Sequence, residues 1–353
     1  MKIRIEREEP FTSRHAGLLA VSAAAAATAA WVEFKSRRAE RDNPPKGKFV
    51  YVDGTRLHYI VRGEGPPVVL LHGNAVMLSD FEASGLIDQL ARNHQVIAFD
   101  RPGFGHSTRP RNRLWTPTAQ AAVLRRALVQ LGIQRAAVVG HSLGTQVALA
   151  MALDSPGSVS GLVLIGGYYY PTMRVDAMLT APVAVPVLGD VMRYTVTALT
   201  ARAMLDRMVR TMFAPNEVPP GFLPAVSREM MLRPLQLRAD AEDAAFMMPQ
   251  ARSLSKRYGE LKMPVTVLAG QDDRILDPKA HSQRLHEALA QSELHVVPGI
   301  GHMLHHIAHD LIVAAVDKSD RGLDSAAHRG GASGEGASQT SEASTAIPNP
   351  AFP

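Results

Sequence analysis

Cysteine is absent from this chain of 353 residues, and that absence excludes several kinds of chemistry. Without a thiol there is no disulfide framework, no cysteine nucleophile, no zinc–thiolate site and no iron–sulfur cluster. The fold and its chemistry must therefore rest on other side chains.

The sequence also lacks a basic surface pattern of the kind that binds nucleic acid. The formal net charge is +5, but residues 1–48 alone carry a net +4, while 318–353 carry −1. The middle of the chain has no basic run with interleaved aromatic residues, which a nucleic-acid-binding domain would show. We therefore expect no nucleic-acid partner.

Long apolar runs are scarce, which argues against a protein with several membrane spans. Hydrophobic residues make up 46% of the chain and charged residues 20%, as in an ordinary soluble protein. One uncharged stretch stands out at residues 16–32, flanked by basic residues on both sides. It fits a short membrane anchor, a cleaved signal that would give a secreted or periplasmic protein, or an alanine-rich helix of a cytoplasmic protein. Of these, we expect membrane association through residues 16–32.

The chain divides into three parts by composition. Residues 1–48 hold the alanine-rich anchor or signal segment and end in a linker at 43–47, which reads Asn-Pro-Pro-Lys-Gly. Residues 49–317 form the predicted folded domain. Residues 318–353 are rich in Gly, Ser, Ala and Pro with few large apolar residues, so they are predicted to be disordered.

Within 49–317, short apolar runs alternate with helical stretches. Strands are predicted at 49–53, 56–61, 68–71, 96–99, 137–139, 162–165, 265–268 and 294–297. Helices are predicted at 79–91, 118–131, 143–153, 279–290 and 303–317. This alternation predicts an α/β protein with a mostly parallel central sheet and helices on both faces. The pattern stops over 168–250, which predicts a helical cap, rich in Met, over the strand ends.

The most informative motif is Gly140-His141-Ser142-Leu143-Gly144, which fits Gly-x-Ser-x-Gly between a buried strand and a helix. The glycines leave room for a sharp strand-to-helix turn that projects the Ser142 hydroxyl above the sheet edge. This context predicts that Ser142 is a nucleophile.

A serine nucleophile needs a base to take its proton and an acid to orient that base. Two later strands end at suitable residues, Asp272 and Asp273 after the first and His302 after the second. His302 is the predicted general base, and either aspartate could orient it. The backbone N–H groups of Asn74 and Leu143 are the predicted oxyanion donors.

Together these motifs resemble the α/β-hydrolase fold family over about residues 49–317. The matching segments are His-Gly at 72–73, Asp-x-Pro-Gly-x-Gly-x-Ser at 100–107, Gly-His-Ser-x-Gly at 140–144, Gly-x-x-Asp at 270–273 and Gly-His at 301–302. The resemblance implies an α/β-hydrolase fold with an inserted helical cap. It also favours Asp273 over Asp272, because the family's acid lies three residues after the glycine.

The resemblance implies a serine hydrolase of the carboxylesterase or lipase type, acting without a cofactor on an apolar or uncharged small-molecule ester. Dehalogenases and epoxide hydrolases of the family use an aspartate where this chain has Ser142. Cofactor-free C–C bond hydrolases and perhydrolases share the triad and remain alternatives, as does a non-catalytic receptor or scaffold. The histidines at 302, 305, 306 and 309 have metal-like spacing, but a metal on His302 would remove the base, so we expect no metal.

Overall fold

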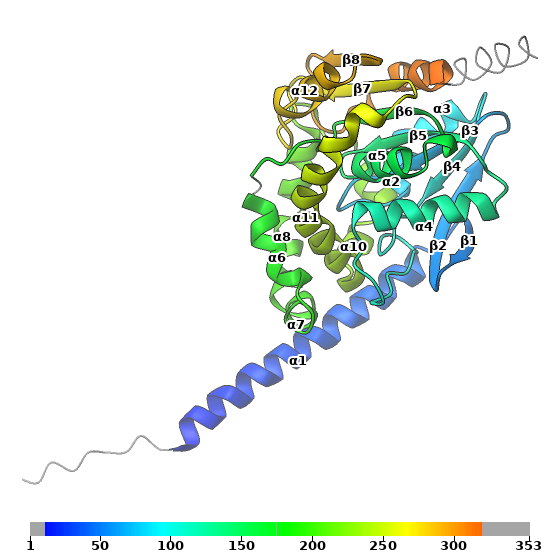
Figure 1. Cartoon of the computed structure of the whole chain (residues 1–353). Helices are drawn as coiled ribbons and strands as arrows, with labels where there is room; N and C mark the ends of the chain where they lie inside the picture. The colour runs from blue at the N-terminus through cyan, green and yellow to red at the C-terminus, as the bar shows by residue number, and fades with distance from the viewer. Residues whose placement is uncertain (1–10, 174, 320–353) are drawn as a thin grey trace, which may run out of the picture.

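A computed structural model describes residues 11–173 and 175–319 of the chain. Its centre is an eight-stranded sheet in the order β1-β2-β4-β3-β5-β6-β7-β8 (Figure 1). The strands β1 and β2 pair antiparallel with their neighbours, and β3 to β8 are parallel. The strands are β1 (Lys48–Val52), β2 (Thr55–Arg62), β3 (Pro67–Leu71), β4 (Gln95–Phe99), β5 (Ala136–His141), β6 (Val159–Ile165), β7 (Val265–Gly270) and β8 (Ser292–Val297).

Helices cover both faces of the sheet, which confirms the predicted fold class. Alternate residues of the buried strands point to opposite faces, so each face has its own apolar core. On one face Val69 and Leu71 pack with α4 (Pro117–Gln130) and α5 (Gly144–Asp154). On the other, Val68 and Leu70 pack with α2 (Ser79–Ser84), α3 (Leu86–Leu90) and the last helix, at 309–319.

Three predicted helices are divided or irregular in the structure. The stretch 79–91 divides into α2 and α3 because Gly85, at φ 79°, ends the first helix in the left-handed region. The stretch 303–317 begins as the 3-10 turn η4 (Leu304–His306), and regular helix starts only at residue 309. The stretch 279–290 contains the π-helical turn η3 (Lys279–Gln283) followed by α12 (Arg284–Ala288).

A helical insertion lies between β6 and β7, as the sequence predicts. It consists of α6 (Val175–Ala184), α7 (Leu188–Tyr194), α8 (Val196–Phe213), α9 (Phe222–Val226), α10 (Arg228–Met231), α11 (Pro234–Leu254) and the 3-10 segment η2 (Ser255–Glu260). The insertion thus extends beyond the predicted boundary at 250, to Leu254 in α11 and to Glu260 in η2. Its interior is a separate apolar cluster built from residues such as Leu205, Met212 and Phe222.

The N-terminal segment forms one long helix, α1 (Phe11–Asp42), which projects away from the body of the molecule (Figure 1). Among the described residues, α1 alone is long and apolar enough to cross a membrane. Its C-terminal part contacts the cap helices α7, α10 and α11. The predicted disordered tail lies outside the described residues, except that 318 and 319 continue the last helix.

Candidate active site

The site lies where the parallel strands end. Leu71 of β3 pairs with Gly140 of β5, and Ile165 of β6 pairs with both His141 and Leu268. The loops after these strands therefore open at one edge of the sheet, as expected for ligand sites in open α/β sheets. The predicted residues Asn74, Ser142, Asp273 and His302 all lie in or beside these loops.

Ser142 occupies a strained turn between β5 and α5. Its φ angle is 52°, a left-handed conformation that a residue with a side chain rarely adopts. The flanking glycines are required by contact, because a Cβ on Gly140 would lie 2.8 Å from the Gly144 carbonyl oxygen. A Cβ on Gly144 would lie 2.1 Å from the carbonyl oxygen of Leu71. The turn therefore accepts only glycine at both positions and lifts Ser142 out of the strand.

His302 and Asp273 form a hydrogen-bonded pair, with His302 Nδ1 2.8 Å from Asp273 Oδ2. Asp273 Oδ1 also accepts the backbone N–H groups of Ile275, at 2.7 Å, and Leu276, at 3.0 Å. Burial opposes ionisation of Asp273, but the His302 ring and these donors hold its pKa below the usual value. Asp272 instead points away and accepts the Gly299 N–H at 2.9 Å. The pair leaves His302 Nε2 as the nitrogen available for proton transfer.

The loop after β3 lies directly against the serine. A Cβ on Gly73 would be 3.0 Å from the Cβ of Ser142. Among the described residues, neither the Asn74 nor the Leu143 N–H donates a backbone hydrogen bond. Both residues line the same cavity as Ser142 and His302. The two amides are therefore available to a negatively charged oxygen at the serine.

His72, in the loop after β3, has structural hydrogen bonds at both ring nitrogens. His72 Nδ1 donates to the Gly73 carbonyl at 2.7 Å, and its Nε2 accepts the Arg101 N–H at 2.9 Å. Burial, with Arg101 close by, lowers the pKa of His72 to about 4, so the ring is neutral. This arrangement holds the loop and leaves the ring no nitrogen for chemistry.

The metal-like histidine cluster contains an aspartate that the sequence did not indicate. Asp80 accepts hydrogen bonds from Nε2 of His305, at 2.9 Å, and of His306, at 2.8 Å. His302 belongs to the Asp273 pair and not to this group. These three side chains could also approach one ion, but their hydrogen bonds already account for their positions. The hydrogen bonds to Asp80 hold η4, which follows His302 in the chain, in place.

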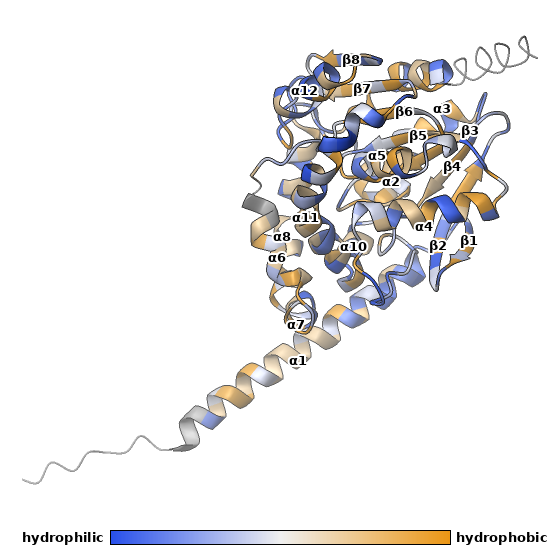
Figure 2. Ribbon diagram, viewed as in Figure 1, coloured by the Kyte–Doolittle hydropathy of each residue, from blue (hydrophilic) through white to orange (hydrophobic). Residues whose placement is uncertain are grey.

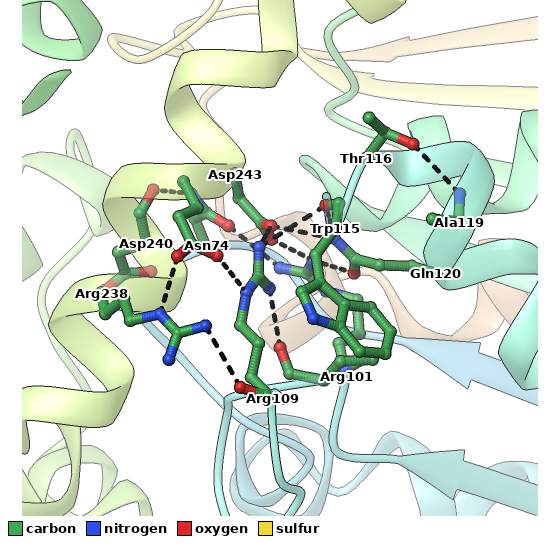
Figure 3. Close-up of polar contacts among 12 residues, drawn as sticks. Asn74, Arg101, Arg109, Trp115, Thr116, Ala119, Gln120, Arg238, Asp240 and Asp243 are labelled. Atoms are coloured by element: carbon green, nitrogen blue, oxygen red, sulfur yellow. Dashed lines mark hydrogen bonds and ion pairs between the residues drawn. The ribbon is translucent and has the colours of Figure 1, made fainter. Parts of the chain in front are cut away.

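A buried charge network joins the cap to the site loops (Figure 3). The Asp243 carboxylate of α11 accepts hydrogen bonds from Arg101 at 2.5 Å, Arg109 at 2.8 Å and Gln120 at 2.9 Å. The two guanidinium groups and the carboxylate are fully buried. Arg101 also donates to the Asn74 side-chain oxygen at 3.0 Å. Sequence reasoning did not identify Asp243, because acidic residues on a helix usually face water.

Asp240, one helical turn before Asp243, contacts the predicted oxyanion loop (Figure 3). Its Oδ1 accepts the Ala75 N–H at 2.7 Å, and its backbone carbonyl accepts the Asn74 side-chain amide at 3.2 Å. Burial, together with the charge of Asp243, raises the pKa of Asp240 to about 7. Sequence reasoning missed this residue as well, since nothing local indicates that it faces the cavity.

A cavity of about 480 Å³ lies between the cap and the strand ends, within the range of small-molecule sites. Ser142 and His302 lie on its wall together with Asn74, Leu143 and Asp240. The remaining wall is largely apolar, and no Lys or Arg is among its lining residues. Five methionines line it, as the Met-rich cap sequence suggests: Met204, Met208, Met212, Met231 and Met247.

Comparison with known proteins gives consistent results. A family described as alpha/beta hydrolase fold matches residues 66–308. The chain is 30% identical to a 2-hydroxy-6-oxo-2,4-heptadienoate hydrolase of Pseudomonas putida, over 74% of this chain and 91% of that protein. Its structure resembles a thermophilic esterase of Thermogutta terrifontis, with a TM-score of 0.64, 22% identity and coverage of 78% and 98% of the two chains. It also resembles a bacterial membrane phospholipase A, with a TM-score of 0.60, 22% identity and coverage of 88% and 98%.

Proposed function

The chain belongs to the α/β-hydrolase fold family, and on that basis we propose that it is a serine hydrolase that cleaves an apolar or uncharged carboxylic ester. The observation that carries this proposal is the 2.8 Å hydrogen bond between Asp273 and His302, and His302 lines the same cavity as Ser142. The strained turn at Ser142 supports it, because strain of this kind concentrates at functional sites.

In the proposed mechanism, Ser142 Oγ attacks the ester carbonyl while its proton passes to His302 Nε2. Asp273 keeps the ring oriented through Nδ1 and stabilises the imidazolium that forms. The N–H groups of Asn74 and Leu143 donate to the oxyanion. The C–O bond then breaks, the alcohol leaves with the proton from His302, and an acyl-Ser142 remains. Water attacks this acyl-enzyme with His302 as base, which releases the acid and restores the serine.

A second candidate is hydrolysis of a C–C bond, which the similarity to the heptadienoate hydrolase favours. A dienoate carries a carboxylate, yet no Lys or Arg is among the residues lining the cavity and Asp240 is. The cavity therefore favours an uncharged ester. A perhydrolase would use the same acyl-enzyme with peroxide in place of water.

The two candidates are separated by the ratio of kcat/KM for p-nitrophenyl esters and for 2-hydroxy-6-oxo-2,4-heptadienoate. We expect turnover of the esters, with a preference that depends on acyl length, and little turnover of the dienoate. Ser142→Ala provides the control, because it removes the nucleophile and leaves the cavity. Faster turnover of the dienoate than of every ester would overturn the ester assignment.

We also propose that α1 anchors the protein to a membrane. Residues 16–32 are uncharged, and α1 is mostly exposed within this chain. Seventeen helical residues span about 26 Å, close to the hydrocarbon thickness of a bilayer of about 30 Å. The similarity to a membrane phospholipase A supports this placement.

A further inference from the structure

Exposed apolar side chains are distributed unevenly over the molecule. Of the twenty large apolar side chains exposed in the described part of the chain, ten lie between residues 173 and 204 and five lie on α1. One of these ten, Met204, lines the cavity; we call the other nine, which lie between residues 173 and 199, the cap face. It includes Leu179 on α6, Leu188 and Val191 on α7, and Val196 on α8, each at least half exposed. A concentration of this kind on a soluble surface indicates an interaction site.

The cap face is also nearly free of charge. Residues 177–201 contain two charged side chains, Asp190 and Arg193, and these pair with each other at 2.5 Å. Asp190 is paired further with Arg111 from the loop that follows β4. In Figure 2 the outer helices of the cap are largely apolar in colour, as is the projecting part of α1. Between residues 177 and 201 the apolar surface is thus not interrupted by unpaired charges.

The junction between α1 and the cap sets the position of this face. Trp31 and Val32, at the end of the uncharged run 16–32, line a small pocket together with Ala198 and Arg202 of α8. Trp31 lies under the Arg202 guanidinium of α8 at 5.1 Å, and Lys35 pairs with Glu229 of α10 at 3.6 Å. A bilayer entered by residues 16–32 would therefore end where the cap begins, with Trp31 in the interfacial layer that tryptophan prefers.

The same cap helices separate this face from the cavity. The cavity wall includes Thr180 and Val183 of α6 and Thr197, Thr200 and Met204 of α8. One side of these helices is therefore in the cavity and the other contributes to the cap face. The route from the cap face to Ser142 crosses one layer of helices.

We propose that the cap face rests on the lipid bilayer that α1 enters, and that the cavity receives a long-acyl ester from that bilayer. The substrate part of this proposal rests on the proposed ester hydrolysis, and the docking part does not. Continuity with α1 favours a bilayer over a second copy of the chain, because the anchor brings the membrane to this face whatever the protein concentration.

Docking is tested without reference to activity. Because the chain lacks cysteine, Leu188→Cys and Tyr51→Cys each place one environment-sensitive fluorophore on the full chain. Tyr51 is an exposed residue of β1, away from the cap. In vesicles of phosphatidylcholine and phosphatidylglycerol, quenching by nitroxide-labelled lipid should be several-fold stronger at position 188. Equal quenching at both positions would overturn the proposal. A change in fluorescence at position 188 that depends on protein concentration in the absence of vesicles would assign the cap face to self-association. That result would overturn the proposal too.

The substrate class is tested with Leu188→Glu/Val191→Glu against the matched pair Tyr51→Glu/Val61→Glu, which changes exposed apolar residues of β1 and β2. Both should hydrolyse soluble p-nitrophenyl butyrate like the parent chain. With a long-acyl ester held in vesicles, the cap variant should lose about tenfold or more in rate and the control should not. Equal vesicle rates would overturn the delivery route. Failure of the parent on butyrate and on the vesicle ester alike would refute the ester function, while the quenching result would still decide docking.

Discussion

Asp272 and Asp273 are neighbours in the sequence but accept hydrogen bonds from different groups. Asp273 holds His302, whereas Asp272 holds the Gly299 N–H. In the proposed mechanism Asp273 stabilises the imidazolium, so Asp273→Asn should lower kcat by about 10⁴. Asp272→Asn keeps an acceptor for Gly299 and should lower kcat less than about tenfold. Steady-state kinetics on one soluble ester checks both, and a larger loss at 272 would reassign the acid.

Asp240 makes the free energy of unfolding depend on pH in a specific way. Its pKa is raised to about 7, so between about pH 4 and pH 7 the folded state holds a proton that the unfolded state lacks. Rising pH therefore lowers the free energy of unfolding through this range, by up to about 1.4 kcal/mol per pH unit, and the loss levels off above about pH 7.

Asp240→Asn should remove this contribution. Between about pH 5 and pH 8, the free energy of unfolding of the variant should rise by about 2–3 kcal/mol relative to that of the parent. Water in the cavity screens the charge of Asp240 and makes this difference smaller. Urea unfolding of both chains across this range gives the comparison. Parallel pH profiles would show that Asp240 does not take up the proton.

The residues that carry the proposed chemistry could be found from the sequence because each follows a strand. Gly-x-Ser-x-Gly fixes Ser142 locally, and parallel strands bring Asp273 and His302 to the same edge. Asp240 and Asp243 could not be found in this way. Their partners, Ala75 and Arg101, lie more than a hundred residues away, so only the packed cap reveals them.

Among the elements, α11 has the strongest polar attachment to the core. Asp243 neutralises the buried guanidinium groups of Arg101 and Arg109. Asp243→Ala leaves both without that carboxylate, which should lower the free energy of unfolding by about 3–5 kcal/mol. Glu293→Gln, in the exposed pair with Lys318, is the matched control and should change it by less than about 1 kcal/mol. Denaturant unfolding measures both, and a loss below 1 kcal/mol for Asp243→Ala would contradict this role.

Across the whole molecule, α1 belongs to the folded body more than its sequence suggests. Composition separates residues 1–48 from the domain, yet Val32 and Ala39 are buried and Glu40 pairs with the buried Arg233 at 2.7 Å. An alanine-rich helix carries no local signal for such contacts, because they depend on where the cap folds. A truncation at residue 42, just before the predicted linker at 43–47, would uncover this part of the cap.

Two truncations separate anchoring from packing. Removal of 1–30 should release the protein from membranes that otherwise retain it through a high-salt wash, while its unfolding free energy stays within about 1 kcal/mol of the parent. Removal of 1–42 should release it as well but lower that free energy by about 2 kcal/mol or more, since it exposes apolar surface and unpairs Arg233. Full-length protein that stays soluble would contradict the anchor, and equal stability of both truncations would contradict the packing.

The central claim is that Ser142 is the nucleophile of an acyl-transfer hydrolase. The measurement that tests it most directly is mass spectrometry of the full chain after exposure to a fluorophosphonate, with the modified peptide sequenced. The account predicts one adduct on Ser142, formed in step with the loss of ester turnover, and none on Ser142→Ala. An adduct on another residue, or full turnover by Ser142→Ala, would contradict it.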